Sequence, residues 1–156
     1  MNEDSPFQLV LETLTPLGLQ TRLVNGSSTA QKYCYDSFWQ SCDLVLTNKA
    51  GEVVEAYDRR TIMMPSSPIS QYAFGSLGPG EAEILQSWQF EKPGKNEYQL
   101  RWGHTIFQEL PPGTYQIVAQ MECQRDSWAD EDRKWYTEDG IWKGSLRSGQ
   151  IKINLP

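Results

Sequence analysis

The sequence predicts an all-β protein in which two antiparallel sheets pack face to face as a sandwich. Polar and apolar residues alternate along 114–121, which is the period of a strand with one buried side. The turn residues Leu110-Pro111-Pro112-Gly113 fix the start of that strand. About seven short strand-like stretches separated by turn residues complete the pattern, and a helical period is nowhere sustained.

The stretch 114–121 is predicted to be the central strand of the sandwich. Its inward face would carry Tyr115, Ile117, Ala119 and Met121. A tyrosine that directly follows a turn near the start of a late strand is typical of the tyrosine corner of Greek-key sandwiches, whose hydroxyl bonds to upstream backbone. We therefore expect the Tyr115 hydroxyl to be buried and hydrogen-bonded.

The first half of the chain contains four further predicted strands. They span 7–12, 19–24, 42–47 and 52–57, with Phe7, Leu9, Leu11, Leu19, Thr21 and Leu23 facing inward in the first two. Asn25-Gly26-Ser27-Ser28 ends the second strand, and Asn48-Lys49-Ala50-Gly51 is a hairpin-type turn. The segment 29–41 carries four aromatic residues without a clear period, so we expect an irregular connection there.

The second half begins with a predicted loop at 58–80, where Pro65 and Pro68 disfavour regular structure. A strand is predicted at 81–90, with Ile84, Trp88 and Phe90 as its inner residues. The segment 98–107 has extended character that Gly103 weakens. The last predicted strand spans 147–155, with Ile151, Ile153 and Leu155 facing inward.

Length and charge limit the classes of protein. A chain of 156 residues is expected to form one domain, 1–156, with 124–146 as an aromatic and acidic insertion before the last strand. The net charge of −6 and the absence of a basic patch argue against nucleic-acid binding. No run of 18 apolar residues is present, so no membrane span is expected.

The compartment follows from the cysteines and the N-terminus. The acidic start of the chain does not have the pattern of a signal peptide. Cys34, Cys42 and Cys123 are an odd number without paired spacing, which indicates reduced thiols. These features predict a cytoplasmic protein.

Several segments resemble a known family when they are taken together. They are 38–54, 77–81 followed by Trp88, 112–119, and Leu23-Val24-Asn25-Gly26-Ser27. In order and spacing they resemble the intracellular proteinase inhibitor family of the BsuPI type, whose members are small immunoglobulin-like β-sandwich domains. The resemblance implies an immunoglobulin-like sandwich of about seven to nine strands. It also implies regulation or inhibition of an intracellular serine protease, although the family offers no reactive-site motif to place here.

No catalytic or metal-binding constellation is visible. The single histidine, His104, could pair with a cysteine nucleophile, but no nucleophile elbow accompanies any Ser or Cys. Cys34 and Cys42 are too far apart in sequence for a zinc pair, and a calcium loop starting at Asp130 fails at Lys134 and Trp135. We therefore expect no enzyme, no metal and no other cofactor.

The stretch 124–146 is the main candidate site, because it combines aromatic residues with six acidic and four basic ones. Its aromatic residues are Trp128, Trp135, Tyr136 and Trp142. Tryptophan and tyrosine are enriched in protein-binding hot spots. Three interpretations stay open: a lid over one end of the sandwich, a partner-binding surface, or a platform for sugars.

A second candidate is the segment Met63-Met64-Pro65-Ser66-Ser67-Pro68, whose prolines could hold it extended in the way that substrate-like protease inhibition requires. The alternative is an ordinary surface loop. The leading hypothesis is a non-enzymatic module that binds a protein partner, in its sharpest form a serine protease. The alternative hypothesis is a carbohydrate-binding module that uses the tryptophan cluster at 128–142.

Overall fold

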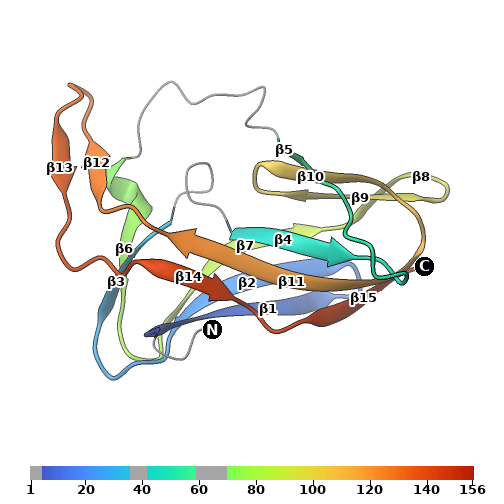
Figure 1. The fold of residues 1–156 in the computed structure, drawn as a ribbon, viewed down its shortest axis with the longest axis horizontal. Helices are drawn as coiled ribbons and strands as arrows, with labels where there is room; N and C mark the ends of the chain where they lie inside the picture. Colours follow the sequence, from blue (N-terminus) through green and yellow to red (C-terminus); the bar gives the residue numbers. More distant parts are fainter. Residues whose placement is uncertain (1–4, 36–41, 59–69) are drawn as a thin grey trace.

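The computed structural model describes residues 5–35, 42–58 and 70–156, and it confirms the all-β sandwich (Figure 1). One short 3-10 helix, η2 (Gln71–Ala73), lies among the strands. The strands are β1 (Phe7–Thr15), β2 (Gly18–Asn25), β3 (Gln31–Cys34), β4 (Cys42–Thr47), β5 (Tyr57–Asp58), β6 (Phe74–Leu77), β7 (Ala82–Gln89), β8 (Glu91–Gly94), β9 (Glu97–Trp102), β10 (Thr105–Leu110), β11 (Gly113–Cys123), β12 (Ser127–Ala129), β13 (Trp135–Thr137), β14 (Gly144–Arg147) and β15 (Ile151–Leu155).

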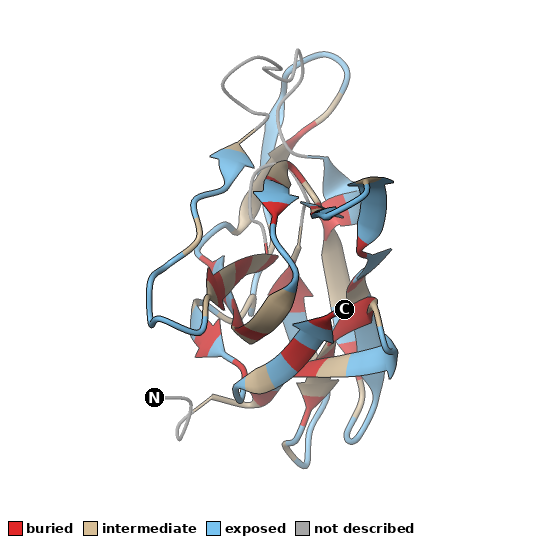
Figure 2. Ribbon diagram, turned by 90° about the vertical axis from the view of Figure 1, so that its right-hand side faces the viewer, coloured by how far each residue is buried: buried red, intermediate tan, exposed pale blue. Residues whose placement is uncertain are grey.

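One layer of the sandwich is the antiparallel sheet β1-β2-β7. The first two strands form a hairpin in which Leu9 lies opposite Leu23, and both side chains are buried. Along each strand the apolar residues at alternate positions face the core, because successive side chains of a strand point to opposite faces. The predicted inner faces of these two strands are confirmed. Buried residues alternate with less buried ones along the first part of β1, whereas β2, the central strand of the sheet, is buried or half-buried along its whole length. Figure 2 colours each residue by its burial.

The other layer is organised around β11, the longest strand. One edge of β11 pairs with β4, while its other edge pairs first with β15 and then with β14. The predicted inner residues are all buried: Tyr115, Ile117, Ala119 and Met121. The predicted inner residues of the last strand are also correct, since Ile153 and Leu155 are buried and Ile151 packs against the core. The predicted start at 147 is wrong, because Arg147 ends β14 and β15 begins at Ile151.

A third sheet, in the order β5-β10-β9-β8, extends the sandwich at one end. The segment predicted as extended with a weak point at Gly103 is in fact the hairpin β9–β10. Gly103 has φ = 59°, which glycine adopts readily, and it makes the turn between Trp102 and Thr105. The indole of Trp102 is buried and donates from Nε1 to the carbonyl of Cys42 at 2.7 Å, which fixes this hairpin to β4.

Three predictions about the middle of the chain were wrong. The returning strand at 52–57 is reduced to one bridge between Val53 and Thr47 and to β5, and Val53 is exposed. The predicted loop at 58–80 contains β6, which pairs with β3. Ile84 faces outward, because a register shift in β7 places it opposite Arg22.

Trp88 is also less buried than predicted. It lies opposite Leu19 but stays 42% exposed, because β7 is an edge strand of its sheet. The third predicted inner residue, Phe90, is buried. Of the three predicted inner residues of 81–90, Phe90 is therefore the one that is buried.

Candidate partner-binding site on the β12–β13 hairpin

The middle of the aromatic insertion folds as the hairpin β12–β13, which stands at one end of the molecule (Figure 1). Three residues, 131–133, form its loop: Asp130 N–H donates to the Lys134 carbonyl and Arg133 N–H to the Asp130 carbonyl, both at 3.0 Å. Arg133 has φ = 61°, the left-handed conformation that closes three-residue hairpin loops. This conformation could not be predicted from the sequence, because glycine or asparagine is the usual residue at such a position.

The Asp130 carboxylate organises this loop. It accepts hydrogen bonds from the backbone N–H groups of Asp132 and Lys134, both at 2.9 Å, and from the Tyr136 hydroxyl at 3.0 Å. These donors, first that of Lys134, hold the pKa of Asp130 below its usual value. The same carboxylate raises the pKa of the Tyr136 phenol. The loop therefore has a defined shape.

One face of the hairpin covers the end of the sandwich. Trp128 and Tyr136 lie opposite each other, and their rings stack with centroids 4.4 Å apart and an interplanar angle of 19°. Trp128 also packs against the buried residues Cys34, Ala73 and Cys123, and its Nε1 donates to Glu138 at 3.0 Å. For Trp128 the geometry is that of a lid residue.

Trp142 lies below the hairpin and packs into the sandwich. Its ring meets Phe7 edge-to-face, with centroids 5.5 Å apart and an interplanar angle of 72°. Its backbone N–H donates to the Lys32 carbonyl at 2.9 Å, and its carbonyl accepts from the Cys123 thiol at 3.1 Å. This tryptophan joins the hairpin to the core.

Trp135 lies on the opposite face of the hairpin. It is paired with Ala129, and because side chains alternate along a strand, both point away from the face of Trp128 and Tyr136. Ala129 is buried, whereas Trp135 is 58% exposed. Of the four aromatic candidates in the insertion, the structure brings Trp128 and Tyr136 together and leaves Trp135 facing outward. Met63 and Met64, the other predicted site residues, lie outside the described residues.

The single histidine stands in the β9–β10 turn and is buried there, and the three cysteines are buried as well. His104 is 7% exposed, and its Nδ1 lies 3.1 Å from Asp58 Oδ1 and its Nε2 3.6 Å from Asp43 Oδ1. Cys42 is fully buried, and loss of hydration raises the pKa of its thiol to about 12, which disfavours a thiolate. Within the described ranges, no three or more His, Cys, Asp or Glu side chains are grouped so that they could hold a metal ion.

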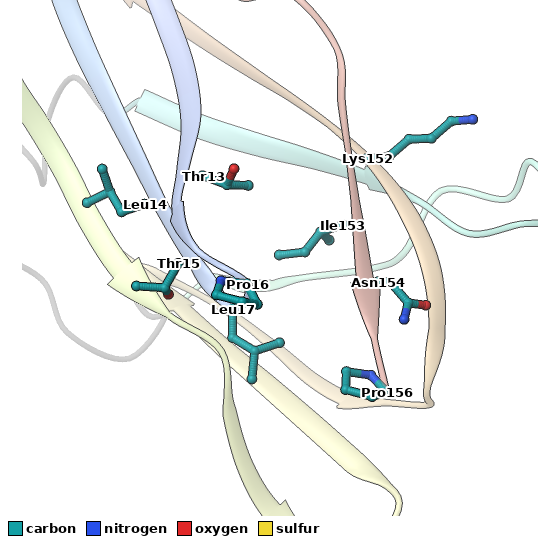
Figure 3. A pocket seen from close by; sticks show the side chains of 9 residues that line it. All are labelled: Thr13, Leu14, Thr15, Pro16, Leu17, Lys152, Ile153, Asn154 and Pro156. Carbon is teal, nitrogen blue, oxygen red and sulfur yellow. The ribbon is translucent and has the colours of Figure 1, made fainter.

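A groove that the sequence did not indicate lies at the other end of the sandwich. Its volume is about 650 Å³. It runs between the β1–β2 turn of one sheet and β15 of another. Figure 3 shows the Ile153 side chain pointing from β15 toward this turn. Leu14 is 55% exposed beside a register shift in β1, which explains why an apolar residue stands on the rim.

Comparisons with known proteins do not assign the chain to a family. No family model matches the chain, and no curated protein matches its sequence. In the parts of the chain that the structure describes, no helix has the length and apolar character needed to cross a membrane.

Proposed function

We propose that this protein is a non-enzymatic binding module that recognises a protein partner through the outer face of the β12–β13 hairpin. The observation that carries the proposal is Trp135, which is 58% exposed on a hairpin whose opposite face packs on the sandwich through Trp128. An exposed tryptophan on a supported strand offers a large contact area at a small cost in conformational entropy.

The arrangement of the hairpin supports the proposal. The stacking of Trp128 on Tyr136 and the hydrogen bonds to Asp130 hold the loop before any partner arrives. Binding by a preformed surface avoids the cost of ordering a flexible segment. The lid and partner-surface interpretations are therefore compatible, because they concern opposite faces of the same hairpin.

The sharper form of the proposal is that the partner is an intracellular serine protease, as the resemblance to the BsuPI-type inhibitors implies. The strand orders β1-β2-β7 and β15-β11-β4 support an immunoglobulin-like arrangement, in which the first, second and fourth of these six strands form one sheet and the other three lie in the second. Carbohydrate binding is the second candidate, since the exposed indole of Trp135 could also stack on a sugar.

The test is affinity capture from a cell lysate with the wild type, Trp135→Ala and Trp88→Ala. Trp88 is the matched control, because it is a partly exposed tryptophan on β7. We expect proteins that the wild type and Trp88→Ala retain to be lost with Trp135→Ala. Equal capture by all three would refute the hairpin as the binding surface.

Two further measurements separate the finer alternatives. Titration of subtilisin-like serine proteases with the protein should reduce their activity in a stoichiometric manner if the protease hypothesis is right. A glycan panel, followed by tryptophan fluorescence, tests the second candidate. If a glycan binds the wild type but not Trp135→Ala, and no protein is captured from the lysate, the hairpin binds sugars and not proteins.

A further inference from the structure

We propose that the outer face of the β12–β13 hairpin recognises an extended polypeptide segment that carries arginine or lysine. The inference rests on the proposed function and names the chemistry of its partner. It follows from three features of the hairpin: its uncompensated carboxylates, the exposed indole beside them and the free edge of β13.

The uncompensated charge at the tip of the hairpin is mainly negative. The carboxylates of Glu131 and Asp132 are exposed and form no hydrogen bond or ion pair with the residues that the structure describes. Arg133, in the same loop, is exposed too and has no side-chain partner among the described residues, so it offsets one of these two carboxylates. The two lysines of the insertion have partners. Lys134 lies over the Tyr136 ring, with Nζ 5.4 Å from its centroid, and Lys143 Nζ is 2.8 Å from Asp126.

These carboxylates stand next to Trp135. Glu131 and Asp132 belong to the three-residue loop closed by Asp130 and Lys134, and Trp135 follows directly on β13. Asp132 lies three residues before Trp135, so their Cα atoms are at most about 11 Å apart, a span that two alternate cations of one extended peptide can bridge. A guanidinium could therefore lie over the indole face while a neighbouring cation meets the carboxylates.

The edge of β13 explains why the segment should be extended. In the described part of the chain, β13 pairs with β12 alone, so its other edge is free, and β13 lies at the outside of the molecule (Figure 1). A peptide that adds to such an edge gains main-chain hydrogen bonds, and its alternate side chains point to the same face. Every second residue of the peptide would then reach the side of Trp135.

The charge of the whole protein favours the same partner. Its net charge of −6 attracts cationic segments over long range and repels acidic ones. This general attraction does not depend on the hairpin. A test must therefore separate the local carboxylates from the net charge.

The experiment uses a short synthetic peptide that alternates arginine with threonine, and isothermal titration calorimetry on the full-length protein. The matched peptides alternate glutamate with threonine and glutamine with threonine. The double variant Glu131→Gln/Asp132→Asn removes the tip charges. The control variant Glu52→Gln/Glu55→Gln removes the same charge from exposed residues that follow β4, at the other end of the molecule.

We expect the arginine peptide to bind the wild type and the control variant within about twofold of each other. The tip variant and Trp135→Ala should each bind it about tenfold more weakly, the loss that about 1.4 kcal/mol produces. Equal weakening in the tip and control variants would overturn the inference, because it would indicate attraction by net charge alone. Equal binding of the glutamate peptide would overturn it as well.

Failure of this inference is distinguishable from failure of the proposed function. If Trp135→Ala loses lysate partners while the arginine peptide does not bind, the hairpin binds proteins but not through cationic segments. If neither lysate proteins nor the peptide depend on Trp135, both proposals are wrong.

Discussion

The hydroxyl of Tyr115 donates a hydrogen bond to the carbonyl of Pro111, 2.6 Å away, across the turn that begins β11. This is the contact expected of a tyrosine corner. Burial of the phenol also raises its pKa. The bond joins the entry of the central strand to the turn before it.

We predict that Tyr115→Phe lowers the free energy of unfolding by about 1–3 kcal/mol, because the Pro111 carbonyl loses its donor. The measurement is a urea unfolding curve. Tyr72→Phe is the control, since Tyr72 is 88% exposed and should leave the midpoint in place. An unchanged midpoint for Tyr115→Phe would mean that the hydroxyl contributes nothing to the corner.

The parts of the fold that the sequence predicts well are regular strands with one buried side. β1, β4 and β15 have buried residues at alternate positions, and in β2 and β11 the predicted inner residues keep that period although further positions are buried too. The hydrophobic period therefore locates these five strands and their inner residues. The prediction was wrong for Ile84, because a register shift is set by pairing with β2 and leaves no mark in the spacing of apolar residues. β6 was missed because it contains Gly75 and is only four residues long.

The composition of the sequence locates the candidate site, but it does not show which residues lie on each face of the hairpin. The run 124–146 is conspicuous in sequence, whereas the separation of Trp128 from Trp135 depends on the register of a hairpin closed by Arg133 in a left-handed conformation. The groove between Leu14 and Ile153 could not be predicted from the sequence for a related reason. Its walls are distant in sequence and meet only when the two sheets pack.

The two tryptophans of the hairpin should differ sharply in their effect on stability. We predict that Trp128→Ala lowers the free energy of unfolding by about 2 kcal/mol, since it removes the stacking on Tyr136 and uncovers the buried cysteines. Trp135→Ala should change it by less than about 0.5 kcal/mol, because the side chain is largely in solvent. Thermal unfolding of the pair is the measurement. Equal losses would contradict the assignment of the two faces.

Gly75 is required by the ring that lies on it. Tyr33 is its cross-strand partner, and a Cβ at position 75 would lie 2.7 Å from Cζ of that ring. The hydroxyl of Tyr33 donates to Glu83 Oε2 at 2.8 Å, which holds the ring in place. We predict that Gly75→Ala costs about 1–3 kcal/mol of stability in a urea titration. Gly149→Ala, where nothing lies within 4 Å, should cost little, and a similar loss at both sites would argue against the close contact.

His104 connects three elements, since it stands in the β9–β10 turn between Asp58 of β5 and Asp43 of β4. We predict that His104→Ala lowers the free energy of unfolding by about 1–3 kcal/mol, because two buried or half-buried carboxylates lose a neighbour and a small cavity remains. His104→Gln keeps a donor and should lose less. If both variants unfold at the wild-type midpoint, the histidine does not hold these strands together.

The three thiols should be protected from reagents in the folded protein. Cys34, Cys42 and Cys123 are all buried, so at about pH 8 a thiol reagent should label them only after denaturation. Fast labelling of any cysteine in the native protein would contradict the packing beneath the hairpin or, for Cys42, between the two sheets.

Stability should also depend on alkaline pH through Cys42. Loss of hydration on burial raises the pKa of its thiol from about 9 to about 12, with a smaller contribution in the same direction from the charge of Asp43. Because the unfolded thiol ionises first, its contribution to stability is intact below about pH 9 and declines as the pH rises toward about 12. Urea midpoints measured across this range should fall more steeply for the wild type than for Cys42→Ala. Parallel slopes for the two proteins would show that this thiol is not protected from ionisation by the fold.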